Sequence, residues 1–159
     1  MPFKPALEFD RIYTIETLSH APDAPKVVRN LYSMLKPGGK LVCIEYEFDY
    51  SSLGVNEWKA IDFAMQYGAL HGAKQFGPGD FISYLKSAGF KDITEHDWTQ
   101  ACLPSFKRIR RIGRPFKKVA GALKLEKYFV NTTISDYYAN AVEENKFWFK
   151  AYTATKPKR

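Results

Sequence analysis

Two apolar stretches on either side of one helical pattern constrain the fold of this chain more than any other feature. Residues 9–15 (FDRIYTI) and 40–48 (KLVCIEYEF) are rich in apolar, β-branched and aromatic side chains, which predicts two buried strands. Between them, Asp23 is a suitable helix cap, and the turn 36–39 (KPGG) is a suitable helix end. The residues with helical spacing in between are Val27, Val28, Leu31, Tyr32 and Leu35.

A strand, a helix and a second strand within about forty residues form a crossover unit, which predicts an α/β fold with a parallel sheet. Further along the chain, the patterns predict helices over 55–67 and 80–87, a strand over 91–99, a helix over 135–145 and a final alternating strand over 147–155. We expect a single domain in three parts. These are a strand and helix part over 1–100, a basic helical region over 101–133, and a final helix and strand over 134–159.

The composition, 45% hydrophobic over 159 residues, suits one buried core. No apolar run approaches the roughly 18 residues that a membrane span needs, and the first residues lack the apolar core of a signal peptide. We therefore expect a soluble, cytoplasmic protein. Cys43 and Cys102 lie far apart without metal-type spacing, which predicts two reduced thiols and no metal site.

The formal charge of +7 is concentrated in residues 107–127. There the basic residues alternate with apolar ones at steps of three and four, which predicts one or two amphipathic helices, broken near 113–115. The first interpretation is a solvated basic face over a core-facing stripe. The second is peripheral contact of 104–128 with an anionic membrane, such as the surface of the endoplasmic reticulum. Nucleic acid is not expected, because no reading motif accompanies the charge.

Three segments resemble the second half of a class I S-adenosylmethionine-dependent methyltransferase. They are FDRIYTIETLSHAPD, LYSMLKPGGKLVCIEYEF and FISYLKSAGFKDI. The likeness is greatest to the sterol 24-C-methyltransferase family, because the segment 16–22 (ETLSHAP) resembles an acid-to-His-Ala-Pro segment of that branch, whereas the LKPGG turn is common to many methyltransferases. The resemblance weakens between residues 100 and 133.

The resemblance implies a partial Rossmann-like sheet, mostly parallel with an antiparallel last strand, and a helical insertion near the carboxyl terminus. Residues 1–3 resemble the family's segment before its fourth strand, so the chain looks like a methyltransferase that begins in the middle. The family's glycine-rich cofactor loop and ribose-binding acid have no counterpart, because the glycines at 38–39 and 77–79 fit turns. We therefore expect the chain alone not to bind S-adenosylmethionine. An uncovered sheet edge would favour a homodimer or a complementing N-terminal half.

Ligands of parallel α/β sheets bind at the carboxyl ends of the strands. Glu16, His20 and Glu45 follow or end the first two predicted strands and are the candidate catalytic residues. In the resembled family, methyl transfer to a double bond leaves a carbocation. Carboxylates and aromatic rings stabilise this charge, and a base then removes a proton. The candidate substrate-binding residues are Tyr13, Tyr46, Trp58, Tyr67 and His71.

Each candidate also has a structural interpretation. Glu16 could cap a turn, His20 could be a satisfied structural histidine, and Tyr13 could belong to the core. Because side chains alternate along a strand, only one of Glu45 and Tyr46 is expected to reach the pocket. His96, between Glu95 and Asp97, is expected at the surface.

Two function classes remain open. The first is a methyltransferase fragment or half that methylates carbon in a sterol-like or other lipophilic acceptor, with a role in sterol biosynthesis and lipid metabolism. The second is a non-methylating protein, either a cofactor-independent enzyme acting on a lipophilic substrate or a pseudoenzyme that binds a partner.

Overall fold

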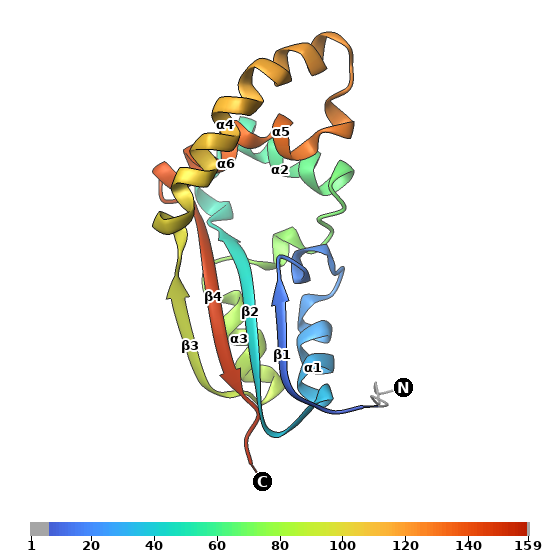
Figure 1. Cartoon of the computed structure of the whole chain (residues 1–159), viewed down its shortest axis with the longest axis vertical. Helices are drawn as coiled ribbons and strands as arrows, with labels where there is room; N and C mark the ends of the chain where they lie inside the picture. Colours follow the sequence, from blue (N-terminus) through green and yellow to red (C-terminus); the bar gives the residue numbers. More distant parts are fainter. Residues whose placement is uncertain (1–6, 159) are drawn as a thin grey trace.

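A four-stranded sheet forms the centre of the computed structural model, which describes residues 7–158. The strands lie in the order β1 (Phe9–Ile15), β2 (Leu35–Phe48), β4 (Phe147–Thr155) and β3 (Lys91–Asp97) (Figure 1). β1 and β2 are parallel, whereas β4 is antiparallel to both of its neighbours, so that β1, β2 and β3 share one direction. The α/β fold with a mixed sheet and an antiparallel last strand is confirmed.

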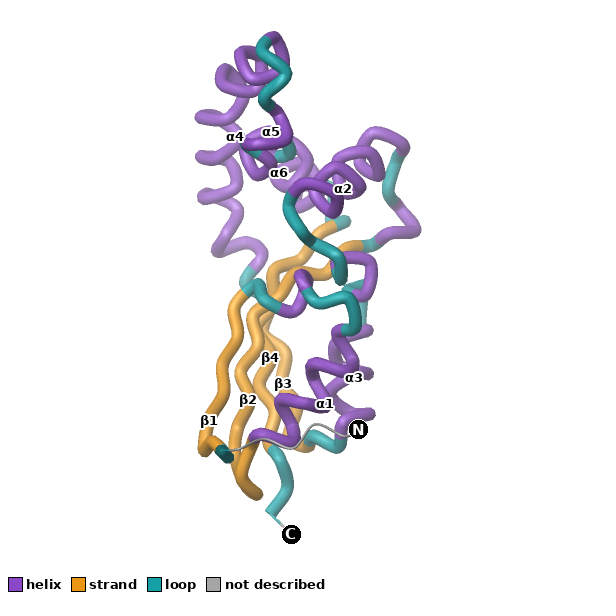
Figure 2. Tube along the Cα trace, turned by 90° about the vertical axis from the view of Figure 1, so that its right-hand side faces the viewer, coloured by secondary structure: helices purple, strands orange, loops and turns teal. Residues whose placement is uncertain are grey.

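The helices divide into two groups. α1 (Ala24–Met34) and α3 (Asp80–Ala88) cover one face of the sheet, while the helices α2 (Val55–Tyr67), α4 (Thr99–Ala122), α5 (Val130–Thr133) and α6 (Ser135–Glu143) gather beyond the carboxyl ends of β1 and β2 (Figures 1 and 2). Asp23 caps α1 as expected, because its side chain accepts a hydrogen bond from the Lys26 amide. Among the described residues, no helix is long and apolar enough to cross a bilayer.

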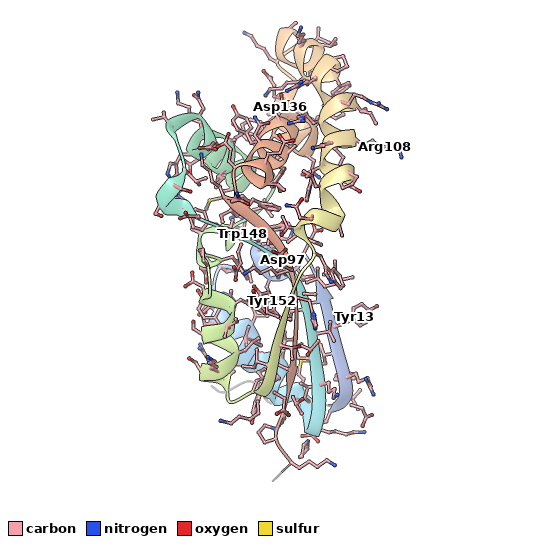
Figure 3. The ribbon with its side chains drawn as sticks, turned by 90° about the vertical axis from the view of Figure 1, so that its left-hand side faces the viewer. Tyr13, Asp97, Arg108, Asp136, Trp148 and Tyr152 are labelled. Atoms are coloured by element: carbon pink, nitrogen blue, oxygen red, sulfur yellow. The ribbon has the colours of Figure 1, made fainter. Side chains whose placement is uncertain are left out.

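One face of the sheet is buried and the other is open. Leu41, Cys43 and Tyr152 pack against Phe81 and Leu85 of α3 in the main core. On the opposite face, Figure 2 shows no described helix against the lower part of β1. The alternate residues of β1 are exposed there, and Tyr13, 77% accessible, points away from the sheet (Figure 3). Tyr13 is thus not a core residue.

Two strand boundaries differ from the expected ones. β2 begins at Leu35 instead of residue 40, because the 36–39 segment continues the ladder through an irregularity, with Gly38 in the left-handed region at φ 80°. The Gly38 amide and the Gly39 carbonyl both pair with Lys156. β3 ends at Asp97, whose carboxylate accepts from the Thr99 amide at 2.8 Å and so begins α4.

The expected break at 113–115 is absent. α4 runs continuously from Thr99 to Ala122 with Pro104 and Pro115 inside it. Gly113 and Ala120 are buried. Arg110 and Arg114, before Pro115, and Lys117, after it, pair with acids of α6. Packing against α6 therefore outweighs the hydrogen bond that proline removes.

Cys43 and Cys102 are free thiols, as expected. The interpretation of residues 1–3 lies outside the part of the chain that the structure describes.

Candidate functional site

The loop after β1 places the first candidate residues. The Glu16 amide still donates to the Ile44 carbonyl at 2.9 Å, so the strand pairing extends to this residue. Glu16 itself adopts φ 47°, a left-handed conformation that costs a non-glycine residue about 1–3 kcal/mol and persists only when its surroundings fix it. The chain then forms a short 3-10 helix over Leu18–His20.

Glu45 of β2 holds this loop by hydrogen bonds to its backbone. Its Oε1 accepts from the Thr17 amide at 2.8 Å and from the Leu18 amide at 2.7 Å. The side chain is fully buried, and its Oε2 has no hydrogen-bond partner among the described residues. Burial raises the pKa of Glu45 to about 7, against the lowering effect of the two amides. The carboxyl group therefore supports the loop.

The segment 69–75 fixes the loop from its other side. The Gly72 amide donates to the Ser19 carbonyl at 2.8 Å, and a Cβ on Gly72 would lie 2.2 Å from the Ala21 oxygen, so only glycine fits. His20 Nδ1 lies 3.0 Å from the Ala69 carbonyl oxygen. Because a carbonyl oxygen only accepts, this contact assigns the proton to Nδ1 and leaves Nε2 of the neutral ring as a base.

Above the loop lies a cavity of about 690 Å³, bounded below by the carboxyl ends of β1 and β2. Its lining contains one carboxylate residue, Glu16, one histidine, His20, and one lysine, Lys127. Eight of its seventeen lining residues are Phe or Tyr: Tyr46, Tyr67, Phe106, Tyr128, Phe129, Tyr138, Phe147 and Phe149. The cavity thus combines one carboxylate, one imidazole and one ammonium group with an apolar, ring-lined interior.

The phenols at the base of the cavity stay neutral. Burial raises the pKa of Tyr46 to about 12, and burial likewise raises that of Tyr138. The Ser19 hydroxyl lies 3.4 Å from the Tyr46 hydroxyl. These phenols can therefore donate a hydrogen bond to a ligand but not act as bases at neutral pH.

The structure brings together four of the predicted site residues, namely Glu16, His20, Tyr46 and Tyr67. Strand alternation sends Tyr46 to the cavity and Glu45 to the opposite side, so the prediction of Glu45 as a residue facing the pocket is wrong.

Three other predicted residues lie away from the cavity lining. Trp58 lies on the side of α2 that faces Tyr50. Its ring stacks on the Tyr50 ring, and Lys74 Nζ lies 5.2 Å from its centre. His71 is exposed on the loop that follows α2, and Tyr13 lies on the open sheet face.

Sequence reasoning missed the contributions of α4, of the 127–132 segment and of β4. Phe147 and Phe149 carried a usable signal, since they alternate along the final strand and therefore share a face. Their register with Phe48 and Tyr46 places that face over the strand ends. Nothing in the pattern of 127–132 indicated that this segment would fold back over the cavity. The described residues hold no cluster of three or more His, Cys, Asp or Glu side chains that could bind a metal ion.

The family model described as "Methyltransferase domain" matches residues 2–95. Phosphoethanolamine N-methyltransferase 1 of Triticum aestivum is 34% identical over 101 residues, which are 63% of this chain and 19% of that protein. The chain therefore spans about a fifth of the length of this relative.

Two solved structures share the fold. Phosphoethanolamine N-methyltransferase 2 of Haemonchus contortus, in complex with phosphomonomethylethanolamine and S-adenosylhomocysteine, superposes with a TM-score of 0.69 at 19% identity, over 94% of this chain and 34% of that one. A cyclopropane synthase of Mycobacterium tuberculosis gives a TM-score of 0.75 at 14% identity, over 94% of this chain and 56% of that one. Neither they nor the wheat relative are sterol methyltransferases, the branch to which the sequence pointed.

Proposed function

The chain belongs to the methyltransferase domain family, and on this premise we propose that it forms the acceptor-binding side of an S-adenosylmethionine-dependent methyltransferase. The observation that carries the proposal is the ring-lined cavity at the carboxyl ends of β1 and β2, with Glu16 and His20 at its base. Such a cavity encloses a small organic acceptor and presents it to a methyl donor at the strand ends.

The described residues do not fit the whole cofactor. Their ten glycines lie in β2 (Gly38 and Gly39), at the two ends of α2 (Gly54 and Gly68), in the segment before α3 (Gly72 and Gly77), at the two ends of α3 (Gly79 and Gly89) and inside α4 (Gly113 and Gly121). None of these forms a glycine-rich turn from a strand into a helix. S-adenosylmethionine supplies an electrophilic methyl group when bound, and we propose that a segment outside this sequence, or another chain, holds it.

The acceptor that best fits the ionisable groups is an amine. Glu16 and the surrounding ring faces attract a protonated amine, and the free Nε2 of His20 can take up the proton that the amine must lose before it attacks a methyl group. Lys127, which also lines the cavity, is suited to bind an anionic group elsewhere on the acceptor. The names of the relatives agree with this class, since phosphoethanolamine carries both an amine and a phosphate.

Carbon methylation of a sterol-like or other lipophilic acceptor is the second candidate. The observation that favours it is the predominantly apolar wall, to which Phe106, Ile109, Phe147 and Phe149 contribute. In that reaction the same carboxylate and ring faces would stabilise a carbocation. A non-methylating protein that retains only the acceptor cavity is the remaining alternative.

Calorimetric titration of the isolated chain separates these cases. The ligands are phosphoethanolamine, its N-monomethyl derivative and an isoprenoid alcohol, and the variants are Glu16→Gln and, as a matched control on an exposed residue of the amino-terminal end, Glu8→Gln. We expect saturable binding of the amines, weakened about tenfold or more by Glu16→Gln and unchanged by Glu8→Gln.

Binding of the alcohol alone would support the second candidate. Absence of binding by every ligand, or equal binding by both variants, would overturn the assignment of the cavity. Acceptor binding without methyl transfer, after a cofactor-binding segment has been supplied, would support the non-methylating alternative.

A further inference from the structure

The side chains of α4 form three parallel rows, each with steps of three and four residues. One row consists of Lys107, Arg110, Arg114 and Lys117, the second of Arg108, Arg111, Pro115 and Lys118, and the third of Ile109, Ile112, Phe116, Val119 and Leu123. The second row lies between the other two on the helix surface. We call the second the outer basic row and the third the apolar stripe.

The acidic residues of α6 form ion pairs with the first row only. Glu143 pairs with Lys107 at 3.0 Å and with Arg110 at 3.3 Å, while Asp136 pairs with Arg114 at 2.7 Å and lies 3.8 Å from Lys117.

The outer basic row has no such partner. Arg108, Arg111 and Lys118 are exposed, and no acidic residue of the described chain pairs with them. Arg108 projects away from the molecule (Figure 3). The positive charge of this row is thus free to interact with a partner.

The apolar stripe is exposed although its pattern is that of a packed helix face. Ile112 and Leu123 are each 61% accessible and Val119 is 57% accessible. The stripe also adjoins the cavity, because Ile109 and Phe129 line the cavity while Ile112 and Phe116 form a shallow depression with Phe129. Whatever covers the stripe therefore also lies beside the cavity.

The positive net charge of the chain comes from one segment. Residues 104–128 hold nine of the 24 Lys and Arg residues and one of the 17 Asp and Glu residues, a net charge of +8. The remaining chain has 15 basic and 16 acidic residues, a net charge of −1. An anionic surface would attract chiefly the end that carries α4, which lies beyond the sheet (Figure 1).

From this arrangement we propose that α4 docks the protein on an anionic lipid surface, with the apolar stripe in the headgroup boundary and the outer basic row against lipid phosphates. An interfacial helix has these properties: an apolar face, an adjoining cationic face and modest overall hydrophobicity. Tyr128, exposed next to the stripe with Lys127 Nζ 5.1 Å from its ring centre, supplies the aromatic residue that favours such a boundary. Docking in this orientation would place the cavity beside the lipid surface.

Vesicle flotation tests this proposal, independently of any methyl transfer. The chain is mixed with phosphatidylcholine vesicles that contain about 30% phosphatidylserine, or none, at about 0.1 M and about 0.5 M salt. We expect binding to the anionic vesicles at low salt, and its loss at high salt and on neutral vesicles. The triple variant Arg108→Gln/Arg111→Gln/Lys118→Gln should lower the partition coefficient about tenfold or more.

The matched control removes three exposed lysines elsewhere, Lys26→Gln/Lys59→Gln/Lys91→Gln, and lowers the net charge by the same amount. It should bind like the wild type, whereas Ile112→Ser/Leu123→Ser should lose binding with an unchanged melt, because both side chains are exposed. Equal loss in the lysine control, equal binding to neutral vesicles, or preferential binding to duplex DNA would overturn the proposal. Self-association that the Ile112→Ser/Leu123→Ser variant abolishes, without vesicle binding, would overturn it as well.

Discussion

At the scale of single residues, Glu16 and Glu45 show how neighbouring carboxylates acquire different tasks. Glu16 has a left-handed backbone conformation and lines the cavity. Glu45 is buried beneath the same loop and accepts hydrogen bonds from two of its backbone amides. The sequence identified both residues, because both occur at strand ends. Their different roles depend on which face of β2 points toward the loop. The alternation places Glu45 and Glu47 on one face and Tyr46 and Phe48 on the other, but it does not show which face that is.

Glu16→Gln should reduce turnover in a complex reconstituted with a cofactor-binding segment. The substitution keeps the shape and removes the charge, and the loss of one such stabilising group commonly costs about 100-fold in rate. Steady-state kinetics together with a thermal melt check this, since the melt should be unchanged. Activity within about threefold of wild type for both Glu16→Gln and His20→Ala, with loss of activity in Arg111→Ala, would move the site to the basic helix.

Glu45 should make the stability of the chain depend on pH. Its folded-state pKa of about 7 lies above the ordinary value for a glutamate, so the folded state retains a proton that the unfolded state has lost. The free energy of unfolding should therefore fall by roughly 3 kcal/mol as the pH rises from about 4.5 to about 7, and then level off.

Glu45→Gln should remove most of this slope, because the amide oxygen still accepts from Thr17 and Leu18 and carries no charge. Urea unfolding at several pH values measures it, with Glu8→Gln as the control that keeps the slope. A slope that survives in Glu45→Gln would assign it to another group.

At the scale of elements, the sequence predicted best where one local pattern decides the outcome. β1, α2 and β4 begin and end at the expected residues, because each has a clear period and a clear stop. The 113–115 segment failed for the opposite reason. A proline in a helix interior is unfavourable locally, but buried small residues and ion pairs with α6 keep α4 continuous through Pro115, and these partners are distant in sequence.

Pro115→Ala should therefore stabilise the chain. The side chain is exposed, and alanine restores the amide that can donate to the Arg111 carbonyl, a gain of about 1–3 kcal/mol. Urea unfolding of Pro115→Ala and of Lys118→Ala, an exposed control one turn later, measures the difference. A loss of stability in Pro115→Ala would mean that the proline ring is needed for the course of the helix.

At the scale of the whole molecule, the fold class followed from one crossover unit, but the closure of the cavity did not. Its base comes from the first 50 residues, and its walls and roof come from residues 67–70, 106–109, 127–138 and 147–149. Contacts between residues so far apart in sequence leave no local pattern, so the position of the 127–132 segment over the cavity could not be predicted.

The isolated chain should bind S-adenosylmethionine weakly or not at all. The described residues provide the strand ends but no glycine-rich turn from a strand into a helix. Calorimetric titration with S-adenosylmethionine and its demethylated product checks this. Saturable binding at low micromolar concentration would show that other residues of the chain replace that turn.

The open sheet face should cause self-association or pairing with a partner. Tyr13 and Ile15 are exposed on it, and β1 has only β2 as a neighbour among the described strands. Sedimentation velocity over a range of concentrations should show association that Tyr13→Lys/Ile15→Lys weakens and Ile112→Ser/Leu123→Ser leaves intact. A monomer at all concentrations, with a cooperative melt, would contradict this.

The position of β4 has a consequence for the biosynthesis of the protein. β4 is the last strand in sequence, yet it lies between β2 and β3 and pairs with both. While the ribosome is still making the preceding helices, β3 has no strand to join and one edge of β2 stays unpaired, so the nascent chain exposes strand edges that chaperones recognise. A ribosome that stops before residue 147 would release a chain that lacks both one of the two central strands of its sheet and one wall of its cavity.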